Sequence, residues 1–588
     1  MPRKLLIFLF LGFFIRLLLV PQPGFEADIA FWKSWSLAAT DKGVVWLTEN
    51  TNYNYPSGFT LVLWIIGKIY QVFANPHNFN QYWDANNYLY LLLSKLPSIL
   101  ADLAIAVIIF VFVSQPKSLN LPEKSKNLAS ALAGLYLLHP VVLFDGAWWG
   151  QVDSFGAVFA FLCLFFLAKK RPILASVALI SGFLLKMQNL IFLPLVFLFI
   201  ARSYPWKTLV KSLAAAVIAF LALSFPFLLA NKLDRVYSLI YQNSDWFPWL
   251  SLRAFNPWWL VSRLNWQASD KVLTLGVLNA KSLSLVVFSA VYFLIIGLIL
   301  FKPKVENLLL SMIASGLAFF LLPTQSHERY FFPALALSIL SLPIFFQNSK
   351  FRKLIWGAFG IFSFSGLVNL NYSLTANYPD NGLGLLGVFN LNFFQVFFSL
   401  FNTGILILIL FWFIKRLPLY WPLGSLLVIL GGFIVPNWQY LFTKQISLTK
   451  IVPVASQQDF GSLQINQSLN SAAGPKSWAF PSINYYFYRR ALATHANSKI
   501  SFDLGGKFKE FKTDIGIDSD AGAKASVEFE VYADNQLLAG PIKMTKFDLP
   551  KRLAVPIKGV KTLTLVARDA GDGITDDHAD WLEPVLSR

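Results

Sequence analysis

The sequence has little charge and almost no cysteine. Only 14% of its 588 residues are Asp, Glu, Lys or Arg, and Cys163 is its single cysteine. A soluble domain carries about 25% charged residues, so the composition excludes an ordinary soluble protein. One cysteine also excludes an internal disulfide framework and a metal site built from several thiolates. Hydrophobic residues make up 56% of the chain, including 57 Phe and 19 Trp, which is typical of a membrane protein.

Long apolar stretches are confined to one part of the chain. Apolar runs of about 20 residues recur between Leu5 and Phe442. Residues 443–588 contain none, and their short alternating segments, broken by Gly and Asp, are typical of β-strands. We therefore predict a polytopic α-helical membrane domain over residues 1–442, followed by an extracytoplasmic β-sandwich over residues 443–588.

Acidic residues are in the minority, and the formal net charge is +18. The Lys and Arg residues stand in short clusters between the apolar runs, where they act as topology signals and not as a surface for nucleic acid. The positive-inside rule then predicts about 13 transmembrane helices in the cytoplasmic membrane, with Leu5–Val20 kept as the first helix. It predicts a cytoplasmic N-terminus and a C-terminal domain outside the cell.

Two apolar stretches do not fit a simple crossing. Phe59–Phe73 contains Lys68 and would break the even number of crossings between two cytoplasmic clusters, so we predict an interfacial or re-entrant helix there. Pro172–Ile200 must enter and return in a segment too short for two full crossings. Its tip carries Lys186 and Gln188. Because a lysine at membrane depth is costly unless it lines a wet cavity or meets an anion, this tip predicts part of a substrate cavity.

On this topology the polar residues of the membrane part collect on the outer face. They are Glu26 and Asp28, Tyr53–Pro56, Asp145–Asp153, Asp245–Trp259 and Ser326–Tyr330. An acid at the membrane surface can act as a general base. A His, an acid and an Arg at a helix start can bind a phosphate through charge-assisted hydrogen bonds.

Each of these features also has a plain structural explanation. A loop carboxylate can simply be solvated, and an ion-paired cluster can anchor a helix at the interface. Tryptophans at helix ends are typical of an aromatic belt. Asp102 stands inside a span, about two turns after Lys95, and a buried pair explains it as well as catalysis does, so we leave it out of the site.

Five short motifs stand in the order found in type C membrane glycosyltransferases, which residues 1–440 resemble. These motifs are Phe25–Trp32, Asn54-Tyr55-Pro56, Trp149–Asp153, Lys186-Met187-Gln188 and His327–Tyr330. The resemblance is closest to bacterial relatives of the mannosyltransferases that extend lipid-linked glycans and glycolipid anchors. Ser57 replaces the second proline of the family's Tyr-Pro-Pro motif. In that family an acid of the first outer loop is the catalytic base, and Asp28 matches its position better than Glu26.

The resemblance implies transfer of a hexose, with mannose favoured, from a polyprenyl-phosphate donor to a hydroxyl of a glycan, glycolipid or protein. The reaction would take place on the outer side, with inversion, in contact with membrane lipid and without a cofactor. On this hypothesis the donor phosphate meets His327, Glu328, Arg329 and Lys186. The residues expected to line the substrate cavity are Tyr55, Pro56, Trp149, Gln151, Asp153 and Gln188.

Residues Thr494–Trp581 resemble a second family, the NPCBM carbohydrate-binding modules. The likeness rests on Thr494-His495-Ala496, Phe502–Gly506, Val531–Asp534, Leu563–Val566 and Asp576–Trp581. The motif residues that it implies are His495, Asp576, Asp577, His578, Asp580 and Trp581. Acids between Asp569 and Asp580 suit a calcium ion, but an Asp–His network capping the sandwich explains them equally, and we predict no metal.

Two other functions remain open from the sequence. A transporter or flippase for a lipid-linked or soluble glycan could use charged groups inside spans as a permeation path. Against it, we find no internal repeat, and the polar residues gather on one face. A non-catalytic glycan receptor would leave the co-occurrence of Asp28 with His327-Glu328-Arg329 unexplained.

Overall fold

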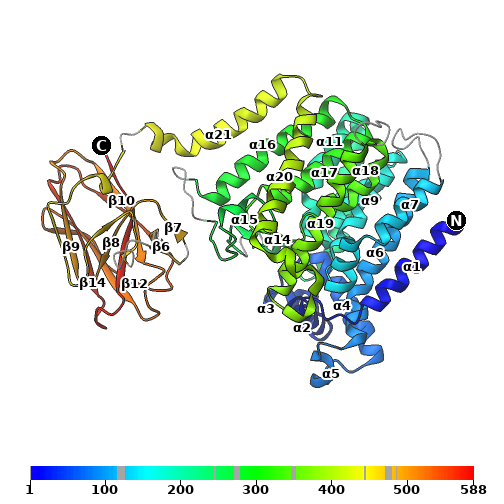
Figure 1. Cartoon of the computed structure of the whole chain (residues 1–588), viewed down its shortest axis with the longest axis horizontal. Helices are drawn as coiled ribbons and strands as arrows, with labels where there is room; N and C mark the ends of the chain where they lie inside the picture. The colour runs from blue at the N-terminus through cyan, green and yellow to red at the C-terminus, as the bar shows by residue number, and fades with distance from the viewer. Residues whose placement is uncertain are drawn as a thin grey trace. The chain divides into compact units, whose positions relative to one another are not determined.

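The computed structural model describes residues 2–114, 126–242, 247–270, 278–345, 352–442, 445–469, 480–484 and 486–588 (Figure 1). The chain divides into two compact units. The helical unit comprises Met1–Phe247, Ser251–Trp266 and Val287–Val428, and the β unit comprises Pro248–Leu250, Gln267–Val286 and Ile429–Arg588. Asp245, in one of the predicted outer segments, and residue 443, at the predicted domain boundary, lie outside the described residues.

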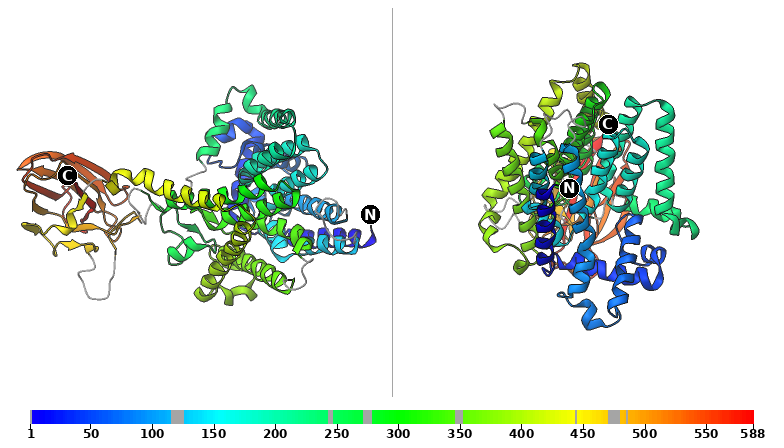
Figure 2. Two further views of the ribbon diagram at one scale, coloured as in Figure 1. Left: turned by 90° about the horizontal axis from the view of Figure 1, so that it is seen from above. Right: turned by 90° about the vertical axis from the view of Figure 1, so that its right-hand side faces the viewer.

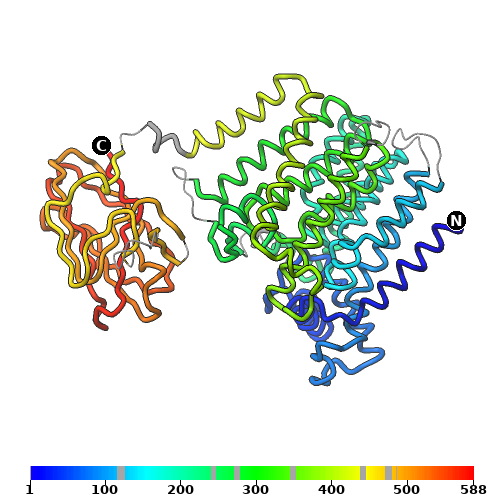
Figure 3. Tube along the Cα trace, viewed as in Figure 1, coloured from blue at the N-terminus to red at the C-terminus, as the bar shows by residue number. Residues whose placement is uncertain are grey.

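The first half of the helical unit is almost entirely helix. Its elements are α1 (Arg3–Leu19), α2 (Glu26–Lys42), α3 (Val44–Asn50), α4 (Ser57–Phe73), α5 (Phe79–Trp83), α6 (Tyr88–Ser114), α7 (Lys126–Leu137), α8 (Pro140–Val142), the π-helix η2 (Leu143–Trp149), α9 (Asp153–Ala168), α10 (Pro172–Leu185), the 3-10 helix η3 (Met187–Phe192), α11 (Leu193–Ser203), α12 (Trp206–Leu223), α13 (Phe225–Leu229) and α14 (Leu233–Gln242). In Figure 3, α2 is seen nearly end-on whereas α1 runs in the plane, so α2 lies across the direction of α1.

The remaining helices alternate with short strands and turns. They are α15 (Pro257–Val261), α16 (Ala280–Phe301), α17 (Val305–Leu321), α18 (Phe332–Phe345), α19 (Arg352–Thr375), the 3-10 helices η5 (Pro379–Asn381) and η6 (Gly384–Asn390), α20 (Asn392–Ile414) and α21 (Tyr420–Phe442). Helices α16 and α21 belong partly to each unit. A two-stranded parallel ribbon joins β1 (Ser251–Leu252) to β2 (Ser326–His327).

Several helices have the length and composition of a membrane span. Within the described residues, α6, α12, α16, α19 and α20 are long and apolar enough to cross a membrane, and α7 with the bent segment Pro140–Trp149 gives a sixth. The predicted helical, apolar N-terminal part is thus confirmed. The number of spans and their orientation stay predictions. The stretch predicted as interfacial forms α4, and the predicted hairpin breaks at Lys186, between α10 and η3.

The helical core contains a buried ion pair. Arg16 on α1 and Asp102 on α6 are fully buried, and Arg16 Nε lies 2.9 Å from Asp102 Oδ2. Tyr136 on α7 donates its hydroxyl to the other carboxylate oxygen at 2.8 Å. Arg16 Nη1 also donates to the Leu137 carbonyl at 2.8 Å. Because all these partners are internal, the group ties α1, α6 and α7 together, and Asp102 has a structural explanation.

The β unit contains two large antiparallel sheets, seen as two layers in Figure 2, and a small antiparallel pair of β6 (Ser482–Ile483) with β7 (Tyr486–Phe487). One sheet has the order β13-β10-β15-β8-β5, with β3 also paired to β15, and the other has the order β12-β11-β14-β9-β4. The strands are β3 (Gln445–Ser447), β4 (Ala455–Gln458), β5 (Gln464–Ile465), β8 (Ala491–His495), β9 (Ser498–Asp503), β10 (Glu510–Ile517), β11 (Ser526–Ala533), β12 (Gln536–Thr545), β13 (Lys551–Pro556), β14 (Thr562–Asp569) and β15 (His578–Ser587).

The two sheets enclose one hydrophobic core. Phe511 and Trp581 from one sheet pack with Phe529 and Leu565 from the other, and all four are fully buried. Trp581 meets the ring of Phe529 edge-on, with the ring centroids 5.1 Å apart. Residues on the inner faces of the two sheets thus pack together to form the core of a β-sandwich. The predicted β-rich C-terminal domain is confirmed.

Candidate functional site

Asp28 stands in the first turn of α2, where a carboxylate interacts favourably with the helix dipole. The linker from α1 is held against η2, because the Phe25 amide donates to the Trp149 carbonyl at 3.3 Å. Gly24 has φ of 63°. A Cβ at Gly24 would collide with that same carbonyl, so only glycine lets the linker approach this closely.

Lys95 fixes the linker from the other side. Its ammonium group donates to the carbonyls of Val20 at 2.9 Å, Gln22 at 2.6 Å and Trp148 at 3.2 Å. Three carbonyl partners satisfy the three donors of a buried lysine. Lys95 therefore connects α6 with the two segments that present Asp28 and Gln151. The sequence marked Lys95 only as a charge inside a span.

Gln151 holds Asp28 in place. The fully buried Gln151 donates its Nε2 hydrogen to Asp28 Oδ2. Burial raises the pKa of Asp28, while the Arg329 guanidinium lowers it. The raised pKa makes Asp28 a stronger base than an exposed aspartate.

Arg329 and Lys186 face the acids of the site. Arg329 Nη1 lies 2.6 Å from Glu328 Oε1, and Arg329 Nε lies 3.8 Å from Asp153 Oδ2. Lys186 Nζ lies 3.4 Å from Asp153 Oδ1. Asp28, Asp153 and Glu328 thus bring three carboxylates to two cations. The site as built carries more negative than positive charge, so any phosphate that enters must share cations already engaged.

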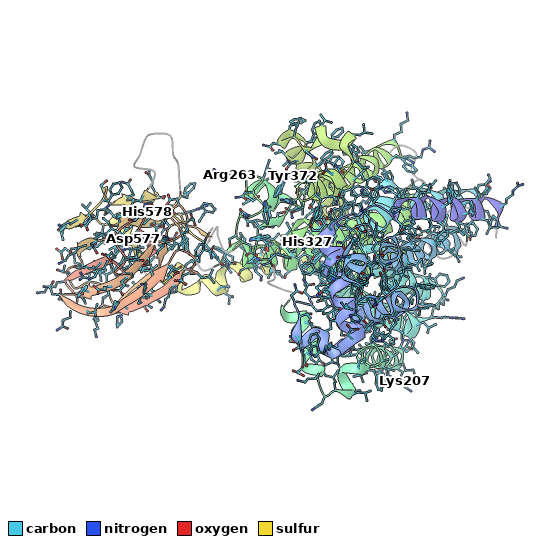
Figure 4. All side chains as sticks on the ribbon, turned by 90° about the horizontal axis from the view of Figure 1, so that it is seen from below. Lys207, Arg263, His327, Tyr372, Asp577 and His578 are labelled. Atoms are coloured by element: carbon cyan, nitrogen blue, oxygen red, sulfur yellow. The ribbon has the colours of Figure 1, made fainter. Side chains whose placement is uncertain are left out.

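The His327–Arg329 segment is anchored by the parallel ribbon, in which Leu252 pairs with His327 (labelled in Figure 4). Burial, followed by Arg329, lowers the pKa of His327. Burial alone would raise the pKa of Glu328, but Arg329 and His327 lower it to about 2. At neutral pH the segment therefore presents a neutral imidazole beside an ionised Glu328. The pairing with residues 251–252 was not foreseen from the sequence, which marked that region only as polar.

The predicted cavity residues have different roles. Lys186 Nζ lies 5.3 Å from the centre of the Tyr55 ring, a cation–π contact, whereas the Pro56 carbonyl accepts a hydrogen bond from Tyr53 at the start of α4. Trp149 stacks on Phe25 at 5.5 Å. The Gln188 side chain is buried, and its Nε2 makes no hydrogen bond within the described part of the chain.

Glu26 forms its hydrogen bond with a residue outside the group formed by Asp28, Asp153, Lys186, Glu328 and Arg329. Its Oε1 accepts a hydrogen bond from Asn381 Nδ2 at 2.9 Å. The next amide, of Ala27, donates to the Tyr378 hydroxyl at 3.0 Å. Both partners come from the segment after α19. No spacing in the sequence links residues 26 and 381, so reasoning from the sequence missed this contact, which makes Glu26 a positioning group for the start of α2.

Buried polar atoms without partners gather around the site. Asp145 is fully buried, and neither of its carboxylate oxygens makes a hydrogen bond with a described residue. Gln151 Oε1 likewise makes no hydrogen bond with a described residue. Such atoms are rare in folded proteins and mark places where a substrate or water supplies the missing partner. Among the described residues, no group of three or more His, Cys, Asp or Glu side chains is arranged to hold a metal ion.

The motif residues of the β unit meet at one end of the sandwich. The rings of His495 and His578 lie 5.6 Å apart, and His578 Nδ1 lies 3.0 Å from Asp520 Oδ1 (His578 is labelled in Figure 4). Asp577 Oδ1 accepts the Ser526 amide hydrogen at 3.0 Å. Asp580 is fully buried, as is the core residue Trp581, whereas Asp576 is exposed. Most residues of the motif are therefore buried and hold the neighbouring loops in place by hydrogen bonds and packing.

Comparisons with known proteins match the C-terminal part. The model of the NPCBM/NEW2 domain family matches residues 444–587. Alpha-1,3-galactosidase B of Akkermansia muciniphila is 29% identical over 140 residues, which are 22% of this chain and only 17% of that protein.

Two solved structures match about a quarter of the chain, and a third covers all of it. CBM51 from Clostridium perfringens GH95, in complex with methyl-galactose, is 30% identical over 24% of this chain and 99% of that chain, with a TM-score of 0.22. CBM51-2 and INT domains from Clostridium perfringens ZmpB, in complex with GlcNAc, are 24% identical over 25% of this chain and 32% of that chain, with a TM-score of 0.23. Arabinosyltransferase EmbB from Mycobacterium smegmatis is 10% identical over 100% of this chain and 65% of that chain, with a TM-score of 0.33.

Proposed function

Because residues 444–587 are an NPCBM/NEW2 domain and the helical unit gathers acids and cations in one place, we propose that this protein is a membrane glycosyltransferase. It moves a hexose, with mannose favoured, from a polyprenyl-phosphate donor to a hydroxyl of a glycan, glycolipid or protein. Transfer occurs on the extracytoplasmic side of the cell membrane, where residues 443–588 also lie, and the N-terminus faces the cytoplasm.

The observation that carries the proposal is the charge interaction between Asp28 and Arg329 in one partly buried site. The acceptor oxygen attacks the anomeric carbon while the bond from that carbon to the phosphate oxygen breaks. The electron pair leaves with the polyprenyl phosphate, and the Asp28 carboxylate takes the hydroxyl proton. Attack opposite the leaving group inverts the anomeric centre. Gln151 keeps one carboxylate oxygen occupied, so the other receives the proton.

Arg329, Lys186 and His327 receive the leaving phosphate. Arg329 is already bonded to Glu328, so the donor phosphate replaces Glu328 as its partner when it binds. Lys186 keeps Asp153 as a fixed counter-ion. Losing one preorganised donor of this kind typically costs roughly 2.7 to 4 kcal/mol of transition-state stabilisation. This exchange explains how an anionic donor enters a site with more carboxylates than cations.

The NPCBM/NEW2 domain binds a glycan, either the acceptor itself or a surface polymer that carries it. Related modules have been solved in complex with methyl-galactose and GlcNAc, which makes these sugars the first candidates. A domain that only stabilised the outer loops would leave acceptor choice unchanged when residues 450–588 were deleted.

The test is transfer of label from a panel of polyprenyl-phosphate sugars and nucleotide sugars to membrane acceptors, with purified protein in lipid. Wild type should use a lipid donor, and Asp28→Asn should lose at least about 10²-fold in rate, because general-base catalysis contributes about that much. Asp41→Asn, near the other end of α2 and paired with the exposed His77, is the matched control and should keep wild-type transfer. Full transfer by Asp28→Asn at normal expression would remove Asp28 from the mechanism, and no transfer from any donor would favour a transporter.

A further inference from the structure

One end of the β-sandwich presents an aromatic ring to solvent between polar groups. The segment after β4 crosses from the edge of one sheet to β5, at the edge of the other. Phe460 lies in this segment and is 63% exposed. Its ring stands 5.3 Å from the buried ring of His495, between ring centroids. The Phe460 ring therefore lies next to a buried side chain and is still largely open to solvent.

Hydrogen bonds fix the segment on both sides of the ring. Gln458 Nε2 donates to the Phe460 carbonyl at 2.6 Å, and Thr494 Oγ1 donates to Gln458 Oε1 at 2.7 Å. Asn497 Nδ2 donates to Asp459 Oδ2 at 3.1 Å, and the Asp459 amide donates to the Asn497 carbonyl at 3.2 Å. The exposed ring thus belongs to a segment that is already ordered, and a ligand would not have to supply that ordering energy.

Asp459 and Asn497 are themselves exposed beside the ring. Asp459 Oδ1 makes no hydrogen bond within the described residues, so it is free to accept from a hydroxyl. Asn497 Oδ1 is occupied by the Asp569 amide at 2.9 Å, which leaves one Nδ2 hydrogen to donate outward. The surface therefore offers an apolar face, a charged acceptor and an amide donor together.

We propose that Asp459, Phe460 and Asn497, named here the Phe460 patch, bind one hexopyranose unit of a glycan. A hexopyranose has a face of C–H groups that packs on an aromatic ring, and hydroxyls at its rim that pair with a carboxylate and an amide. A purely apolar partner would leave Asp459 Oδ1 without a hydrogen bond, and a purely charged partner would leave the ring uncovered. The inference rests on the proposed glycan binding of this domain and names the residues that perform it.

The test is ligand-observed NMR titration of the full chain in lipid nanodiscs, which avoids detergents with sugar headgroups. The probes are methyl galactoside, methyl mannoside and N-acetylglucosamine. Phe460→Ala should weaken the best probe at least about tenfold, which corresponds to 1.4 kcal/mol. Phe460→Trp should bind as tightly as wild type or tighter. Asp459→Asn keeps an acceptor for Asn497 but removes the charge and the free carboxylate oxygen, so it should weaken binding without changing the unfolding midpoint of the β unit.

Phe547→Ala is the matched control. Phe547 is 71% exposed and follows β12, at the opposite edge of the same sheet from β4. Strands in a sheet are about 4.8 Å apart, so the four intervals between β12 and β4 put it beyond the reach of a monosaccharide. If wild type binds a probe and Phe460→Ala binds it equally, the Phe460 patch is refuted while glycan binding stands. If wild type binds no probe, glycan binding by the domain fails as well.

Discussion

Two carboxyl groups meet inside the β-sandwich, and the domain should therefore lose stability as the pH rises. Asp518, at the end of β10, is 1% exposed, and Asp580, on β15, is fully buried. Burial, followed by the charge of Asp520, raises the pKa of Asp518 to about 6. Burial and the neighbouring Asp518 raise the pKa of Asp580 well above its usual range. Both groups therefore favour the protonated form in the folded domain.

The direction of the effect follows from linkage. An aspartate in the unfolded chain titrates near 3.9, so raising the folded pKa to about 6 separates the two states by roughly two units. At 1.36 kcal/mol per unit, Asp518 contributes about 3 kcal/mol that is fully present below about pH 4. That contribution is lost as the pH rises through about 6. The pKa of Asp580 is also raised, so ionisation of Asp580 lowers the free energy of unfolding further at higher pH.

The measurement is urea unfolding of residues 445–588 between pH 4 and pH 8, because the core of the sandwich is built from residues of this segment alone. Asp518→Asn keeps the size of the side chain but cannot ionise, so its free energy of unfolding should fall less over this range than that of wild type, by about 3 kcal/mol. Glu528→Gln, a half-buried acid on β11, is the control and should follow wild type. Equal slopes for wild type and Asp518→Asn would refute the reasoning.

Two further changes probe the helical unit. Gly24→Ala places a methyl group against the Trp149 carbonyl at a positive φ, so it should displace Asp28. Transfer should fall at least about tenfold, with the protein still inserted in the membrane. Unchanged transfer would show that the linker does not position the base. Glu328→Gln removes the anion that is paired with Arg329, so the KM for the lipid donor should fall. A higher KM would mean that Glu328 orients Arg329 toward the donor and is not displaced by the donor phosphate.

The sequence was sufficient for features that depend on local pattern. Apolar run length separated the helical part from the β-rich part, and the motif Asp576–Trp581 identified the NPCBM domain, which the family match confirms. The same local information could not assign roles within a motif. Trp581 is a fully buried core residue, while Phe460, outside every recognised motif, carries the exposed ring. Exposure depends on which strands become neighbours, and spacing along the chain does not contain that information.

Long-range contacts within the site were equally hidden. The order of the motifs suggested that residues near 28, 151, 186 and 329 share a cavity, but not that Glu26 would bond to Asn381 across 355 positions. Nor could it show that Arg329 is paired with Glu328, the residue beside it, more closely than with Asp153. Side-chain direction at the start of a helix decides such partners, and two acids two residues apart, Glu26 and Asp28, point to different neighbours.

The contrast between two sets of buried charge favours an enzyme over a transporter. Both oxygens of Asp102 are engaged, one by Arg16 and one by Tyr136, so this carboxylate needs no passing ion. The carboxylate of Asp145 has no hydrogen-bond partner in the described chain. Asp145, Asp153 and Arg329 each have buried side-chain atoms without a hydrogen-bond partner in the described chain, and the charges of Asp153 and Arg329 act on Asp145. A substrate bound beside them would supply partners to several of these atoms at once. Several buried groups that lack partners and interact with one another are what transfer at a fixed centre requires.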